Sequence, residues 1–145
     1  MHAELLDGFF GTLAQAVRRI DVSPGAAPPL EQMQDNVHRI LAVVEKERAM
    51  TRILVREAVG LDDEFDGRLA DFYGRVTALI ERALRLGMDM GLVRPCDPSL
   101  VAWCVLGSVK EVVDRVVLVE RRGALDLDTL ARELVAFNLH GLFRQ

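Results

Sequence analysis

The chain has 145 residues, half of them hydrophobic and 28% of them charged, which excludes intrinsic disorder and suffices for one domain with a real core. The net charge of -4, with both signs interspersed, argues against a nucleic-acid-binding surface, because such a surface needs a basic face. The two cysteines, Cys96 and Cys104, favour a reducing compartment. Without a recognisable signal peptide or an apolar stretch long enough to span a bilayer, we expect a cytoplasmic protein.

Apolar residues recur at helical spacing from the start of the chain and predict a first helix from about His2 to Ile20. The proline- and glycine-rich segment from Val22 to Pro29 ends this helix. A second helix is expected from about Leu30 to Lys46, and a short third one from about Arg48 to Val59. No N-cap residue precedes the first helix, as in a chain from which an upstream part has been removed. A natural start that frays explains this observation equally well, and both interpretations remain open here.

Three consecutive acids, residues 62–64, predict the start of a long fourth helix, because acids in a first turn complement the helix dipole. This helix is expected to end at Met90, where Gly91 supplies a left-handed stop. Asp97 is the expected N-cap of the fifth helix, and Pro98 takes its first position, where a missing N–H costs nothing. The pattern therefore predicts an all-α fold of six helices.

The last two helices, at about residues 98–121 and 127–143, are apolar over roughly twice the ~100° arc that one core requires. The valine-rich run within the first of them could form a strand, but its 3,4 spacing is helical and no partner strand exists. The surplus apolar surface must be buried, and a second copy of the chain is the simplest partner. The interface residues predicted from this pattern are Val105, Val109, Val112, Val116, Leu134, Asn138, Gly141 and Leu142.

Asn138 lies in the middle of the apolar arc of the last helix. It could pair with its symmetry mate across a two-fold axis and fix the register of a dimer, as polar residues do in coiled coils. It could equally well bond to the backbone or to water, and both interpretations remain open.

Three segments carry a family resemblance: ERAMTRILVRE at residues 47–57, ALRLGMDMGLVRPCDPSLV at 83–101, and 134–143 with Gly141-Leu142 near its end. Together with the order and lengths of the helices, they resemble the C-terminal regulatory domain of the TetR family of bacterial transcriptional repressors. Members of that family carry an N-terminal helix-turn-helix head, and this chain has none. The resemblance implies one regulatory domain over residues 1–145, which dimerises through its last two helices as a four-helix bundle.

The resemblance also implies a pocket for a small apolar effector among the middle helices. The candidates on the apolar faces are Met33, Val37, Met50, Leu54, Phe72, Val76 and Trp103. The alternative for each of them is that it simply fills the core. We expect no metal, no cofactor and no membrane partner, and DNA binding only through the missing head.

The sequence has no glycine-rich phosphate loop, no Cys-x-x-Cys pair and no nucleophile elbow, so we expect no enzyme. We therefore predict the effector-binding and homodimerisation domain of a TetR-like regulator. The alternative is a standalone head-less helical dimer, an interaction module that pairs with a full-length regulator.

Overall fold

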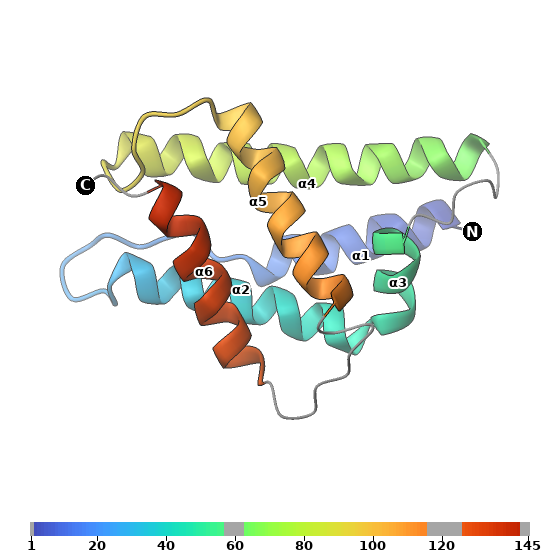
Figure 1. Ribbon diagram of the computed structural model, residues 1–145, viewed down its shortest axis with the longest axis horizontal. Helices are drawn as coiled ribbons and strands as arrows, with labels where there is room; N and C mark the ends of the chain where they lie inside the picture. The colour runs from blue at the N-terminus through green and yellow to red at the C-terminus, as the bar shows by residue number, and fades with distance from the viewer. Residues whose placement is uncertain (1, 57–62, 116–125, 143–145) are drawn as a thin grey trace.

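The computed structural model describes residues 2–56, 63–115 and 126–142 of the chain. These residues form helices and connecting loops and contain no strand. The helices, labelled in Figure 1, are α1 (His2–Ala16), α2 (Pro29–Lys46), α3 (Arg48–Arg56), α4 (Asp63–Asp89), α5 (Pro98–Val112) and α6 (Leu127–Leu142). The prediction of an all-α fold with six helices in this order is confirmed.

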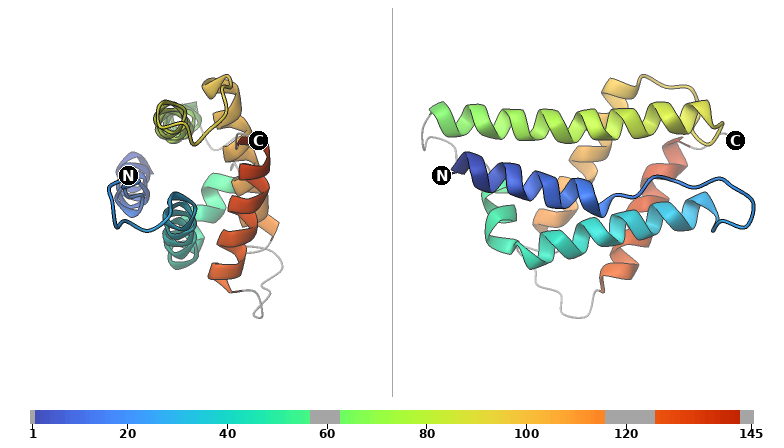
Figure 2. Two further views of the ribbon diagram at one scale, coloured as in Figure 1. Left: turned by 90° about the vertical axis from the view of Figure 1, so that its left-hand side faces the viewer. Right: turned by 180° about the vertical axis from the view of Figure 1, so that it is seen from behind.

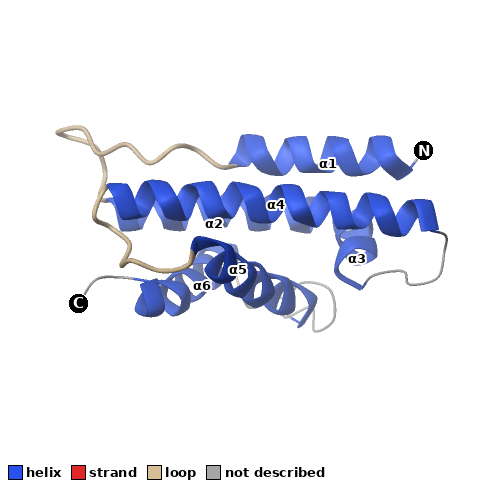
Figure 3. Cartoon of the chain, turned by 90° about the horizontal axis from the view of Figure 1, so that it is seen from above, coloured by secondary structure: helices blue, strands red, loops and turns tan. Residues whose placement is uncertain are grey.

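The helices are arranged in layers. α1, α2 and α4 run along the long axis of the molecule, and the left view of Figure 2 shows them nearly end-on. α5 and α6 cross this set on one side, and α1 lies on the opposite side of α2 and α4 (Figure 3). α2 packs mainly against α6 and α4 mainly against α5, whereas α5 and α6 touch each other over only a short length. None of the described helices covers the outer side of the α5–α6 layer (Figure 3).

Three groups of buried residues hold these layers together. The first cluster joins α2 to the ends of α5 and α6 and contains Leu41, Val44, Val113, Leu130, Ala131 and Leu134. The second cluster joins α1 to α4 and contains Leu6, Phe9, Leu69 and Phe72. The third cluster joins the second half of α4 to α5 and α6 and contains Leu84, Val93, Ala102, Val135 and Leu139.

The first helix is shorter than predicted, because it ends at Ala16 instead of Ile20. Side chains of α2 bind the backbone groups that a longer helix would have used. The Arg39 Nε donates to the Ala16 carbonyl at 2.8 Å. The amide of Asn36 accepts from the Arg18 N–H and donates to the Arg18 carbonyl, both at 2.9 Å. A tertiary contact thus replaces the last helical turn that the periodicity predicts.

The fourth helix ends at Asp89, one residue before the predicted end, and Gly91 terminates it as expected. Gly91 adopts a φ of 75°, and the Leu92 N–H donates to the Gly87 carbonyl at 2.9 Å, as in a glycine-terminated helix. A Cβ at Gly87 would lie 2.6 Å from the Val93 Cγ2, so this glycine lets the following chain fold back closely on the helix. The predicted ends of the third and fifth helices, at residues 57–59 and 116–121, lie outside the described residues.

Candidate effector pocket and dimerisation surface

The structure divides the predicted effector-pocket residues between clusters. Met50 and Val76 pack against the second cluster, to which Phe72 belongs. The Phe72 ring stacks on Phe9 of α1 at a centroid distance of 6.0 Å. Met33 instead packs against the third cluster, and Val37 packs against both the first and the third, near α5 and α6. The sequence therefore predicted apolar, inward-facing positions, and the structure brings three of them to the junction of α1, α3 and α4.

The other two pocket candidates differ. Trp103 has an exposed fraction of 58% and belongs to none of the three clusters of described residues, so it lies apart from the other candidates. It was predicted from its position at the edge of an apolar stripe, and that edge faces outward. Leu54 falls within α3, but its side chain lies outside the described residues.

A cavity of about 420 Å³ opens between α1 and α4, away from the predicted positions. Its lining is partly charged, and an ion pair between the Arg75 Nη2 and the Asp7 Oδ1, 2.6 Å long, crosses between the two helices there. The Arg75 guanidinium also lies over the Phe10 ring, 4.6 Å from its centroid. Sequence periodicity could not find this cavity, because its two walls come from helices far apart in the chain.

The predicted interface residues on α5 turn towards the chain's own core. Val109 and Val112 pack against the first cluster and Val105 against the third. Leu134 on α6 is itself part of the first cluster, with an exposed fraction of 5%. The valine stripe of α5 thus forms the inner side of the α5–α6 layer.

Three other predicted interface residues are not tested by these contacts. Val116 lies outside the described residues. Gly141 and Leu142 belong to the end of α6, but their burial is not described. Their place in an interface stays a prediction.

Asn138 makes its hydrogen bonds within the chain. Its Nδ2 donates to the Leu134 carbonyl at 2.8 Å, and its amide lies within hydrogen-bond distance of the Ser108 hydroxyl on α5. Asn138 was predicted either to pair with its symmetry mate or to bond to the backbone or water. In the single chain it bonds to the backbone. The Asn138–Ser108 contact also links the two helices where they cross.

The exposed apolar residues of the layer lie on the opposite side of the same helices. On α5, residues 100, 103, 104 and 107 follow each other at helical spacing, and residues 136 and 137 lie on α6. The exposed fractions are 62% for Leu100, 58% for Trp103 and 72% for Phe137, unusual values for large apolar side chains. We call this surface the outer face; its members are Leu100, Trp103, Cys104, Gly107, Ala136 and Phe137.

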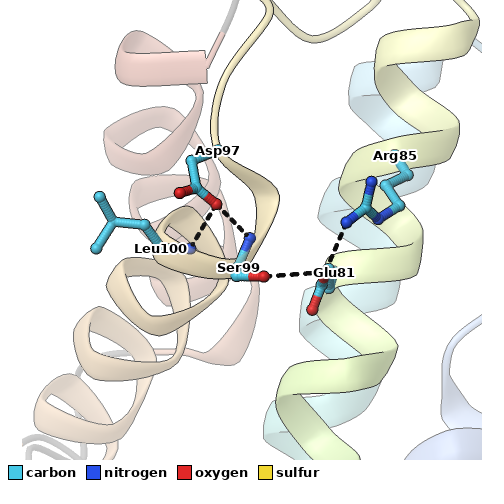
Figure 4. Close-up of polar contacts among 5 residues, drawn as sticks. All are labelled: Glu81, Arg85, Asp97, Ser99 and Leu100. Carbon is cyan, nitrogen blue, oxygen red and sulfur yellow. Dashed lines mark hydrogen bonds and ion pairs between the residues drawn. The ribbon is translucent and has the colours of Figure 1, made fainter.

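A polar network ties the start of α5 to α4 (Figure 4). The Asp97 carboxylate accepts hydrogen bonds from the Ser99 and Leu100 N–H groups at 3.1 and 3.3 Å, which confirms Asp97 as the N-cap. The Ser99 hydroxyl donates to the Glu81 Oε1 at 3.0 Å, and the Arg85 Nη2 donates to the same oxygen at 2.9 Å. The hydrogen bond from Arg85, and then the one from Ser99, hold the pKa of Glu81 below its ordinary value of 4.5.

This shift predicts a pH dependence of folding. Because the folded chain lowers the pKa of Glu81, its ionised form adds stability above the ordinary pKa, and this stability is lost as the pH falls through the lowered value. We expect the free energy of unfolding to decrease less between pH 7 and pH 3 in Glu81→Gln than in the wild type. Urea denaturation at a series of pH values measures the difference. Glu45→Gln, at an exposed position on α2, is the control, and an identical pH profile for Glu81→Gln would contradict the prediction.

The described residues contain neither a candidate metal site nor a helix that could span a membrane. No group of three or more His, Cys, Asp or Glu side chains among the described residues is arranged to hold a metal ion. In the same part of the chain, none of the helices combines the length and the apolar character needed to cross a membrane.

Comparisons with known proteins agree with this fold. Residues 26–142 match the family model of the tetracyclin repressor-like C-terminal domain. The crystal structure of a TetR family transcriptional regulator, PfmR from Thermus thermophilus, superposes with a TM-score of 0.71 at 19% sequence identity. The match covers 98% of this chain and 73% of that chain, and at this identity it shows the fold. No curated protein sequence matches the chain.

The layered six-helix fold is shared with this solved regulator structure. The chain belongs to the family of tetracyclin repressor-like C-terminal domains.

Proposed function

We propose that this chain is the effector-binding and homodimerisation domain of a TetR-like bacterial transcriptional regulator, acting in the cytoplasm without catalysing a reaction. The observation that carries this proposal is the outer face on α5 and α6. It exposes three large apolar side chains on the two helices through which, by the resemblance, members of the family dimerise.

In the proposed dimer, the outer faces of two copies pack together and bury Trp103 and Phe137. Four helices, α5 and α6 from each copy, then form the bundle. Gly107 and Ala136 are small, so they leave room for close approach of the helices beside the aromatic rings. Ion pairs such as Arg132–Asp128, at 2.9 Å, lie on exposed α6 positions and suit the polar rim of an interface.

We place the effector site beside the second cluster, around Met50, Phe72 and Val76. Residues of α1, α3 and α4 meet there, so a ligand that favours one packing of these helices would shift their equilibrium. By the resemblance, the DNA-binding heads precede α1 in the family. A displacement of α1 would therefore change the spacing of two heads that must fit one turn of DNA.

Native mass spectrometry of the purified chain tests both parts of the proposal. We expect a dimer, and in a preparation that retains its ligand, a dimer with an added small mass. A bare dimer would support the interface and shift the function towards a helical interaction module. A monomer at micromolar concentration would contradict the proposal, because the outer face would then have no partner.

A further inference from the structure

One buried guanidinium nitrogen lacks an acceptor. The Nη2 of Arg48 is enclosed by protein and makes no hydrogen bond in the part of the chain that the structure describes. Other arginines do have acceptors: the Arg75 guanidinium binds Asp7, Arg85 binds Glu81, and Arg39 binds the Ala16 carbonyl. Two of these three, Arg75 and Arg85, lie with well over a third of their side chains in solvent. The enclosed donor of Arg48 therefore lacks an acceptor, although buried polar groups are usually hydrogen-bonded.

Arg48 is the first residue of α3 and lies at a corner between helices. The beginning of α3 lies beside the C-terminal end of α5 in Figures 1 and 3. One turn further along α3, on the same face as Arg48, the buried Thr51 hydroxyl donates to the Val44 carbonyl at 3.2 Å. Val44 belongs to the first cluster, together with Val113 at the end of α5. The corner is therefore formed by the end of α2, the start of α3 and the end of α5.

A second cation lies on the α5 side of this corner. Lys110 is one turn before Val113, and its Nζ lies over the ring of Tyr73 on α4, 4.8 Å from the centroid. Tyr73 packs against the second cluster, beside which we place the effector. Positive charge and apolar surface thus occur together near the proposed effector site.

A buried guanidinium N–H without an acceptor is strongly destabilising, whereas a carboxylate can bind it with two parallel hydrogen bonds. A ligand that brings its own carboxylate would satisfy this donor. The second cluster, against which Met50 of the same helix packs, would accept a hydrocarbon body. We propose that Arg48 is the anion-binding residue of the effector site and that the effector is an organic carboxylate with an apolar body. This inference rests on the proposed effector-binding function and adds the chemical class of the ligand.

The test compares three probes with the same hydrocarbon chain and different head groups: octanoate, octan-1-ol and octylammonium. Isothermal titration calorimetry on the purified full chain measures the affinities for the wild type, Arg48→Met and Arg52→Met. Arg52 is the matched control, because it lies on the same helix with an exposed side chain. Circular dichroism establishes that each variant is folded.

We expect octanoate to bind the wild type roughly 10- to 100-fold more tightly than octan-1-ol, the ratio typical of one charge-assisted hydrogen-bonded contact. Octylammonium should bind more weakly than either, because its charge has the sign of Arg48. Arg48→Met should lose the preference for octanoate, and Arg52→Met should keep it. We also expect the melting temperature of ligand-free Arg48→Met to equal or exceed that of the wild type, because an unsatisfied buried donor is removed.

Equal affinity of the wild type for octanoate and octan-1-ol, no binding of octanoate, or a preference that survives Arg48→Met would each overturn the inference. If Arg48→Met does not fold, the inference is overturned as well, because the guanidinium is then a structural group; Arg48→Lys then shows whether charge alone restores folding. Native mass spectrometry of the same samples separates the two proposals. A dimer without a carboxylate preference overturns only the ligand class, whereas a monomer contradicts the proposed function.

Discussion

Trp103→Glu is expected to convert the proposed dimer into a monomer. Trp103 has an exposed fraction of 58% in the single chain and lies at the centre of the α5 part of the outer face. Aromatic residues at such positions contribute about 2 kcal/mol or more to an interface, and a buried carboxylate without a partner adds a further desolvation penalty. We therefore expect the dissociation constant of the dimer to increase roughly 30-fold or more. Sedimentation velocity over a range of concentrations measures this change.

Two further variants make the Trp103 experiment specific. Leu5→Glu places a charge on another exposed apolar residue, on α1 and away from the α5–α6 layer, and should leave the dimer intact. Val109→Glu places the charge on the inner side of α5, against the first cluster, and should lower the stability of the fold itself. If Trp103→Glu remains as dimeric as the wild type and Val109→Glu yields a folded monomer, the interface lies on the valine stripe and our assignment of the outer face is wrong.

Leu41→Ala is expected to produce the largest loss of stability among single apolar truncations on α2. Leu41 has an exposed fraction of 0% and lies in the first cluster, where α2 supports both α5 and α6. Removing a fully buried leucine side chain costs about 3 kcal/mol, through lost burial and the cavity that remains. For a domain of this size we expect the melting temperature to fall by about 10 °C. Because dimerisation makes melting temperatures concentration-dependent, the variants must be compared at one protein concentration.

Leu30→Ala is the matched control for this variant. Leu30 lies on the same helix and allows the same chemical change, but its exposed fraction is 43%. We expect its effect on the free energy of unfolding to stay within about 0.5 kcal/mol. Equal effects of the two substitutions would show that the first cluster does not carry the packing of α2 against the last two helices.

The number, order and class of the helices could be predicted from the sequence, because they depend on local patterns. A 3,4 spacing of apolar residues, a glycine with positive φ at Gly91 and an aspartate N-cap at Asp97 all act within a few residues. The predicted end of the first helix was wrong, because contacts with α2 intervene there. α1 ends at Ala16 because Asn36 and Arg39 of α2 bind the backbone groups around it, 18 and 23 residues away in the chain.

The division of α5 into an inner and an outer side could not be predicted in this way. The helix is apolar around most of its circumference, so its periodicity does not show which stripe meets the core. The valine stripe, predicted as the interface, packs inward, and the side with Leu100 and Trp103 remains exposed. The same holds for the pocket candidates, because apolar spacing identifies an inward position but not the cluster to which it belongs.

The sequence by itself thus determined a six-helix, all-α domain whose last two helices are apolar over an unusually wide arc. The tertiary structure alone decided which side of α5 stays exposed among the described residues, and it alone revealed that the Nη2 of Arg48 is enclosed without an acceptor there. The physical reason is the range of the interactions. Helix formation and capping act within one or two turns, whereas burial and hydrogen-bond satisfaction depend on residues brought together from distant parts of the chain.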